Sequence, residues 1–116
     1  MSSATSRPAV SVRGIREALG ISRERIGRLL NLTSGTIARL ERAGRLPSGV
    51  AAVTRLAQIQ EVVELGLVVF TPDGFTRFMS APAPSFRGLT PLQLIERGEA
   101  EQLFGALASL HEGNPS

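Results

Sequence analysis

Apolar residues recur at intervals of three and four along most of the chain, which is the period of an amphipathic helix. The repeat is regular over residues 53–67. Over residues 100–110 it has the i, i+3, i+4, i+7 spacing of a helix with one buried face. The pattern predicts seven helices and at most one short strand, so we expect an all-α fold built as a small helical bundle.

Hydroxyl-bearing residues and prolines mark where these helices begin. The first helix is expected over Val10–Leu19, and Ser22 and Thr33 are expected to cap the two helices that follow. Ser48 is the expected cap of the long helix, and Thr90 opens a capping box. Another helix is predicted to start at residues 71–73, with proline in its first turn, and to run to about residue 79.

Glycine and asparagine mark where helices end or change. Asn31 tolerates a left-handed backbone and suits a tight turn. Gly66 is expected to interrupt the long helix. Residues 67–70 lie between Gly66 and Pro72, and periodicity does not decide between a short strand and a buried connector there.

The pattern divides the chain into four segments. Residues 1–9 are rich in serine and proline and are expected to form a flexible arm. Residues 10–47 form a helix-turn-helix region, and residues 48–70 form a long connecting helix and linker. Residues 71–116 form a second helical module, which opens with a stretch rich in turns.

Charge is distributed unevenly along the 116 residues. Residues 1–55 hold ten Arg and three Glu, whereas residues 56–116 hold three Arg and seven acidic residues. A basic first half suits a polyanion such as DNA, because arginine neutralises phosphates and releases counterions. The acidic second half argues for a different partner. Ordinary solvated faces on two helical halves are the alternative.

Several functional classes find no support in the sequence. There is no cysteine, so disulfides and thiolate metal sites are excluded. The first seven residues lack the apolar core of a secretory signal, and the apolar runs are too short to span a bilayer. We therefore expect a cytoplasmic protein without a membrane partner.

Catalytic chemistry is not expected either. His111 is the only histidine, and near a helix end it balances the helix dipole. The acidic pairs Glu61/Glu64 and Glu99/Glu101 fit a solvated helix surface, and no phosphate-binding glycine motif occurs. The chain is therefore predicted not to be an enzyme, with no catalytic residue, metal site or cofactor.

Residues 21–47 have the spacing of a helix-turn-helix, in which the second helix enters the DNA major groove. Small residues stand at the start of that helix, where they can reach phosphates or base edges, and arginines follow them. A plain helical hairpin without DNA contacts is the alternative. The candidate DNA-binding residues are Arg23, Arg28, Thr33, Ser34, Gly35, Thr36, Arg39, Arg42 and Arg45.

The same segment resembles the Xre or Cro/repressor class of DNA-binding proteins. The resemblance rests on residues 32–37, where a hydrophobic residue precedes a hydroxyl cap and a Thr-Ile pair, and on Glu41-Arg42. It implies a DNA-binding unit in the first half of the chain.

Residues 78–98 hold no reactive group, so this stretch is expected to act by its shape. Pro82 and Pro84 stiffen an arm that carries Phe86, and Thr90-Pro91 fixes the start of the next helix. A stiff, pre-ordered surface loses little entropy on association and therefore suits a binding module.

This second half resembles the toxin-binding domain of the MbcA/ParS/Xre antitoxins. The resemblance covers residues 15–113, with Phe78 in the place of the usual tryptophan. The matching positions are Phe78-Met79, Pro82, Phe86, Gly88, Thr90-Pro91, Leu92, Leu94-Ile95, Gly98 and Leu103 to Gly113.

The resemblance implies an antitoxin of a type II toxin–antitoxin system. Such proteins neutralise RES-domain toxins, which consume NAD or transfer its ADP-ribose, by covering the NAD pocket of the toxin. The helix-turn-helix often represses the shared operon, so operator DNA is a second expected partner. Residues 71–116 are then the toxin-binding domain. The candidate toxin-binding residues are Phe86, Arg87, Arg97, Glu101, His111, Glu112, Gly113 and Asn114.

Two further expectations concern assembly and the competing function. Helix-turn-helix proteins bind as symmetric dimers, so we expect a homodimer joined through the long central helix, within a hetero-oligomeric toxin–antitoxin complex. A stand-alone Xre-like transcriptional regulator, whose C-terminal half dimerises or senses a ligand, is the alternative function.

Overall fold

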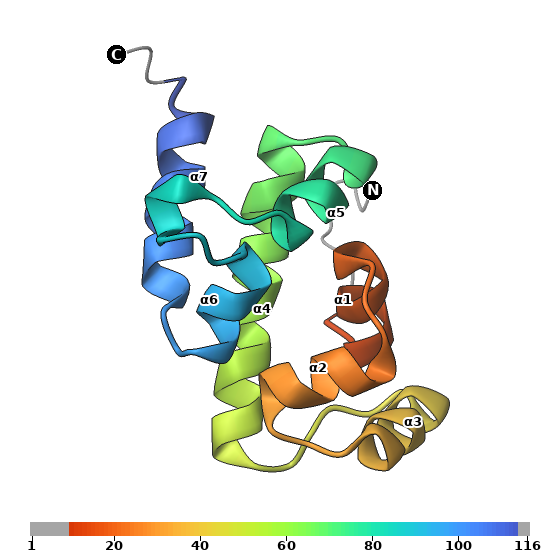
Figure 1. The fold of residues 1–116 in the computed structure, drawn as a ribbon. Helices are drawn as coiled ribbons and strands as arrows, with labels where there is room; N and C mark the ends of the chain where they lie inside the picture. The colour runs from red at the N-terminus through yellow and green to blue at the C-terminus, as the bar shows by residue number, and fades with distance from the viewer. Residues whose placement is uncertain (1–9, 114–116) are drawn as a thin grey trace, which may run out of the picture.

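The computed structural model describes residues 10–113, and every regular element in that range is helical (Figure 1). The elements are α1 (Val12–Leu19), α2 (Arg23–Leu30), α3 (Ser34–Ala43), α4 (Val50–Val69), α5 (Pro72–Ser80), the 3₁₀ turn η2 (Pro84–Phe86), α6 (Pro91–Glu96) and α7 (Ala100–His111). The predicted all-α fold with seven α-helices is confirmed for these residues. The expected arm at residues 1–9 lies outside them.

The predicted caps hold at most helix starts. The hydroxyls of Ser22, Thr33 and Thr71 each accept a hydrogen bond from a backbone N–H in the first turn. Thr90 and Gln93 form the full capping box, with both reciprocal bonds present. These local side-chain bonds replace the helical partners that first-turn N–H groups lack.

Two predicted helix starts are wrong. The first helix begins at Val12 rather than Val10, because Ser11 is extended and its hydroxyl accepts from the Gly14 N–H. The long helix is not capped by Ser48. Gly49 occupies the cap position and makes no side-chain cap bond.

Gly66 does not interrupt the long helix, which continues to Val69. The reason is tertiary packing. The Phe75 ring lies so close to Gly66 that a Cβ on this residue would overlap the ring. The glycine at position 66 therefore allows α4 and α5 to pack closely, and it does not break α4. Residues 67–69 form the last turn of α4, and Phe70 is its extended C-cap, so the strand alternative is excluded.

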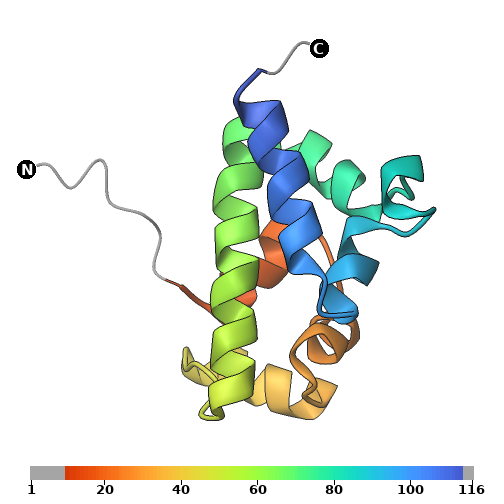
Figure 2. The same ribbon diagram turned by 90° about the vertical axis from the view of Figure 1, so that its left-hand side faces the viewer.

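Helix α4 is the central element of the bundle. It packs most extensively against α7, which runs beside it in Figure 2, and on other sides against α1 and α2. A single cluster of buried apolar side chains includes Leu19 of α1, Leu56 of α4 and Leu103 of α7. Residues on both sides of the predicted segment boundaries thus share one core. The boundaries themselves stay predictions.

Helix α3 lies at one end of the molecule, where it packs against α2 and α1 (Figure 1). The C-terminal end of α7 lies at the opposite end. The start of α3 and the C-terminal end of α7, each of which holds predicted contact residues, are therefore well separated in space. No helix in residues 10–113 is both long and apolar enough to cross a bilayer.

Candidate nucleic-acid and partner-binding interfaces

Helices α2 and α3 are joined by a tight turn, as the sequence predicts. Asn31 adopts a left-handed conformation with φ of 60° and ends α2. Gly27 is buried under the turn, and a Cβ there would stand 2.5 Å from the carbonyl oxygen of Leu32. The role of Gly27 was not found from the sequence. The available signal is a glycine in the middle of a short helix, next to the buried Ile26 and four residues before the turn at Asn31.

The N-terminal turn of α3 holds the small residues predicted to contact DNA. The Thr33 hydroxyl accepts from the Thr36 N–H at 3.1 Å and bonds the Thr36 hydroxyl at 3.0 Å. Arg39 donates to the Thr36 hydroxyl at 3.3 Å. Ser34 and Gly35 are exposed. The turn is thus pre-ordered, and its first N–H groups present the positive end of the helix dipole, which favours a phosphate.

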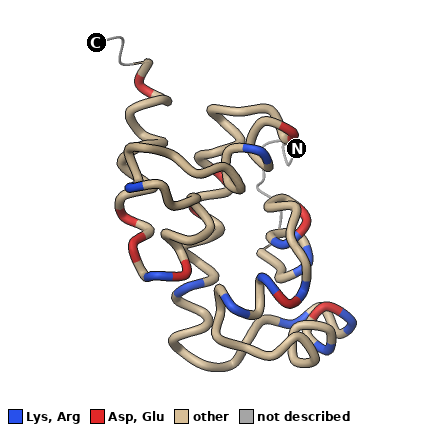
Figure 3. Tube along the Cα trace, in the orientation of Figure 1, with Lys and Arg blue, Asp and Glu red and all other residues tan. Residues whose placement is uncertain are grey.

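Three predicted arginines surround the other end of α3. Arg39, Arg42 and Arg45 are exposed and line a shallow hollow of about 630 Å³ together with Leu40, Ala43, Leu46 and Ser48. Within residues 10–113, no carboxylate lies at ion-pair distance from these three side chains. Their charge is available to an external anion. Figure 3 shows arginines concentrated over α1–α3.

A buried carboxylate holds the three N-terminal helices together. Glu41 of α3, with 1% of its side chain exposed, accepts from Arg16 of α1 at 2.6 and 3.1 Å and from Arg23 of α2 at 2.9 Å. Arg13 lies 3.9 Å from the same carboxylate. The hydrogen bond from Arg16 is the largest cause that holds the pKa of Glu41 below its ordinary value, and the same bond raises the pKa of Arg16.

One predicted DNA contact, Arg23, takes part in the Glu41 cluster. Its Nε donates to Glu41 and is not available to a phosphate, although 47% of the side chain is exposed. The role of Glu41 was not found from its chemistry in the sequence. The signal was its position four residues after the buried Ile37, which places both on the inner face of α3.

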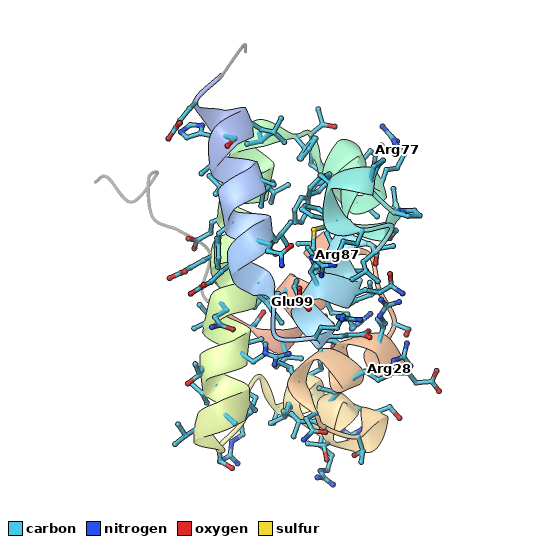
Figure 4. All side chains as sticks on the ribbon, turned by 60° about the vertical axis from the view of Figure 1, so that its left-hand side comes forward. Arg28, Arg77, Arg87 and Glu99 are labelled. Carbon is cyan, nitrogen blue, oxygen red and sulfur yellow. The ribbon has the colours of Figure 1, made fainter. Side chains whose placement is uncertain are left out.

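The predicted partner-binding residues near the start of α7 are already engaged within the chain. Arg87 donates to Glu99 at 2.7 Å and Arg97 donates to the same carboxylate at 3.0 Å. Arg87 and Glu99 face each other in Figure 4. Hydrogen bonds from Arg87 first, and then from Arg97, hold the pKa of Glu99 below its ordinary value. The side chains remain partly exposed, so the cluster is accessible to a partner.

Phe86, one of the partner-binding residues predicted from the sequence, is buried rather than on the surface. Its side chain is 4% exposed and belongs to the shared core. The Pro84–Phe86 turn therefore points its large apolar side chain inward, and Arg87, with φ of 60°, turns the chain back toward α6. The packing of Phe86 in the core holds the arm in its position.

The remaining predicted contacts fall at the two ends of α7. Glu101 lies in its first turn, whereas His111, Glu112 and Gly113 form its exposed end. At 1.5 Å per residue, about 15 Å separates Glu101 from His111 along the helix. The structure does not bring these residues into one cluster. Asn114 lies outside the described residues.

Comparisons with known proteins address the fold. No family model matches the sequence, and no curated protein matches it. The chain is similar to a chain in the crystal structure of the M. tuberculosis MbcT-MbcA toxin-antitoxin complex, with a TM-score of 0.74 and 23% sequence identity over 90% of this chain and 94% of that chain. The fold expected from the MbcA/ParS/Xre resemblance is therefore confirmed.

Proposed function

We propose that the chain is the antitoxin of a type II toxin–antitoxin pair. The observation that carries this proposal is the similarity of almost the whole chain to a chain in a toxin–antitoxin complex. The match extends over both helical halves, so it is not a shared helix-turn-helix alone. In this role the chain is a binding protein and not an enzyme.

The proposed target is a RES-domain toxin that consumes NAD or transfers its ADP-ribose. A pocket that accepts the two phosphates of NAD needs cationic groups, and acidic side chains complement such a surface. Glu101 and Glu112 are exposed at the two ends of α7. We place the contact along the exposed side of this helix, with His111–Gly113 closest to the NAD pocket.

The direct test pairs this chain with a RES-domain toxin, which the proposal expects in the adjacent gene. Co-expression should restore growth and the cellular NAD level, and the two chains should co-purify as one complex. A matched pair of variants locates the contact: Glu112→Arg should weaken the complex, whereas Glu24→Arg on α2 should not. Unchanged NAD depletion by the toxin at saturating wild-type chain would sink the proposal.

A second proposed activity is repression of the shared operon through DNA binding. Support comes from the ordered first turn of α3 and from the three arginines that have no carboxylate partner among the described residues. An operator fragment from upstream of the gene should bind the wild-type chain. Binding should weaken steeply with salt, because phosphate contacts release counterions.

The exposed side of α4 supports the proposed homodimer. Val50 is 83% exposed and Val53 is 40% exposed, so apolar side chains face solvent among the polar residues of this side of α4. A second copy of the chain that covered them would remove their apolar surface from water. Light scattering should give a dimer for the wild-type chain and a monomer for the Val50→Glu/Val53→Glu variant. A monomeric wild-type chain would contradict this part.

A further inference from the structure

One guanidinium ties the first half of the chain to the second. Arg55 of α4 donates through Nη1 to the carbonyl oxygen of Leu29 at 2.9 Å and to that of Ile95 at 2.8 Å. These carbonyls lie in the last turns of α2 and α6, where helical partners are lacking and a cation is favourable. Arg55 therefore holds the C-terminal ends of α2 and α6 next to each other.

A carboxylate bridges the same two helices. Glu96, the last residue of α6, accepts from Nε of Arg25 at 2.6 Å, and Nε of Arg28 lies 3.9 Å from the same oxygen. Both arginines belong to α2. The side chains of Arg25 and Glu96 are 27% and 28% exposed, and that of Arg28 is 61% exposed. The bridge is therefore in contact with solvent and open to competition.

Arg25 and Arg28 stand on the helix that packs against α3, the element with the proposed DNA-binding turn. Figure 4 shows Arg28 directed outward from α2. A guanidinium that is neutralised by a carboxylate contributes less to phosphate binding, because the carboxylate repels the phosphate and occupies the donors. Glu96 thus competes with DNA for two arginines.

We propose that Glu96 restrains Arg25 and Arg28 and keeps the DNA affinity of the free chain below the level that its arginines allow. A cationic partner surface that takes up Glu96 releases both arginines to phosphates. This inference rests on the proposed function, because it needs DNA binding and a partner at the α6–α7 corner. Linkage then requires that DNA strengthens partner binding by the same factor.

The other carboxylates of the chain are not suited to this role. Glu41 is 1% exposed, so a partner cannot reach it. Glu99 is accessible, but its partners, Arg87 and Arg97, do not belong to α2. Of these three carboxylates, Glu96 is the one that is both accessible and paired with arginines of α2.

The test measures binding of a random-sequence DNA duplex as a function of NaCl concentration. Such a probe isolates phosphate contacts from base recognition. Glu96→Gln keeps the shape of the side chain and removes its charge. The affinity should rise about three- to tenfold, and the slope of log K against log salt should steepen by roughly 0.9 for each released arginine.

Two matched variants separate release of the arginines from a general change in charge. Asp73→Asn removes the same charge from the exposed first turn of α5 and should leave affinity within about twofold of wild type, because distant charges are screened. Glu96→Gln/Arg28→Gln has the wild-type net charge and should lose part of the steeper slope. Circular dichroism verifies that each variant is folded.

The outcomes distinguish this inference from the proposed function. If Glu96→Gln and wild type bind DNA with equal affinity and slope, the inference is overturned while DNA binding stands. If neither binds, the DNA part of the proposed function fails and the inference fails with it. In complex with the toxin, wild type should gain DNA affinity and Glu96→Gln should not. An equal gain in both overturns the release step.

Discussion

Two parts of this molecule use the same chemistry in different surroundings. At the junction of α1, α2 and α3, Glu41 lies among Arg13, Arg16 and Arg23 with 1% of its side chain exposed. At the start of α7, Glu99 lies between Arg87 and Arg97 with 27% exposed. In both places one carboxylate accepts from two arginines that come from different segments.

The difference in burial gives the two clusters different energetic roles. Removing one partner from a buried pair leaves an uncompensated charge, which costs several kcal/mol. A solvated pair contributes little, because water and salt replace the lost partner. The Glu41 cluster therefore stabilises the arrangement of the N-terminal helices. The Glu99 cluster contributes little to the stability of the fold, so its residues are available to bind a partner.

The largest expected effect is that of Glu41→Ala. It leaves Arg16, with 17% of its side chain exposed, without a carboxylate partner, so we expect a loss of about 2–4 kcal/mol in the free energy of unfolding. Urea denaturation followed by circular dichroism measures it. Glu112→Ala at the exposed end of α7 is the control and should change stability by less than about 0.5 kcal/mol. Equal stability of both variants would contradict the comparison.

The second prediction separates the two functions. Arg39→Ala/Arg42→Ala should lower the affinity for operator DNA about ten- to hundredfold and reduce the salt slope by about two, because two phosphate contacts are lost. The same variant should inhibit the toxin as wild type does. Glu101→Gln/Glu112→Gln should bind DNA normally and inhibit the toxin less well, because acidic side chains complement a cationic pocket. If both variants lost DNA binding and toxin inhibition equally, the two activities would not reside in separate surfaces.

The third prediction concerns acid. The pKa of Glu41 is lowered in the folded chain, so its stabilising effect is present above the ordinary glutamate pKa of about 4.3 and is lost as pH falls below it. Wild type should therefore lose stability steeply on acidification below about pH 4.3. Glu41→Gln should show a shallower loss, and Glu99→Gln a loss close to wild type. Thermal unfolding at a series of pH values measures the slopes.

The smallest expected effect is that of Glu99→Ala on stability. Its charge is solvated and its arginines stay in contact with water, so the midpoint of urea unfolding should move by no more than the error of the measurement. The affinity of the complex with the toxin is the quantity that should change. A large stability loss with unchanged toxin affinity would reverse the roles of the two clusters.

The sequence predicts those parts of the fold that depend on neighbouring residues. The cap hydroxyls of Ser22, Thr33 and Thr90 each accept from the backbone N–H three positions later, and their pattern is visible in a single sequence. The left-handed turn at Asn31 is of the same kind. Such features require no knowledge of which helices are in contact.

Features that depend on distant residues are not visible in this way. The packing of Gly66 against Phe75, the inward direction of Phe86 and the three arginines around Glu41 all require the tertiary fold. Helix propensity counts Gly66 as a break, because it ignores the aromatic ring that occupies the space of a Cβ. The pairing of Arg87 and Arg97 with Glu99 cannot be predicted from the sequence for the same reason.

The central claim is that the C-terminal half covers the NAD pocket of a toxin. Steady-state NAD consumption by the RES-domain partner, measured over a range of NAD concentrations with this chain at fixed amounts, tests it most directly. Competition is expected: the apparent KM for NAD should rise with the amount of the chain while kcat is unchanged. Fractional inhibition that is the same at every NAD concentration would contradict it.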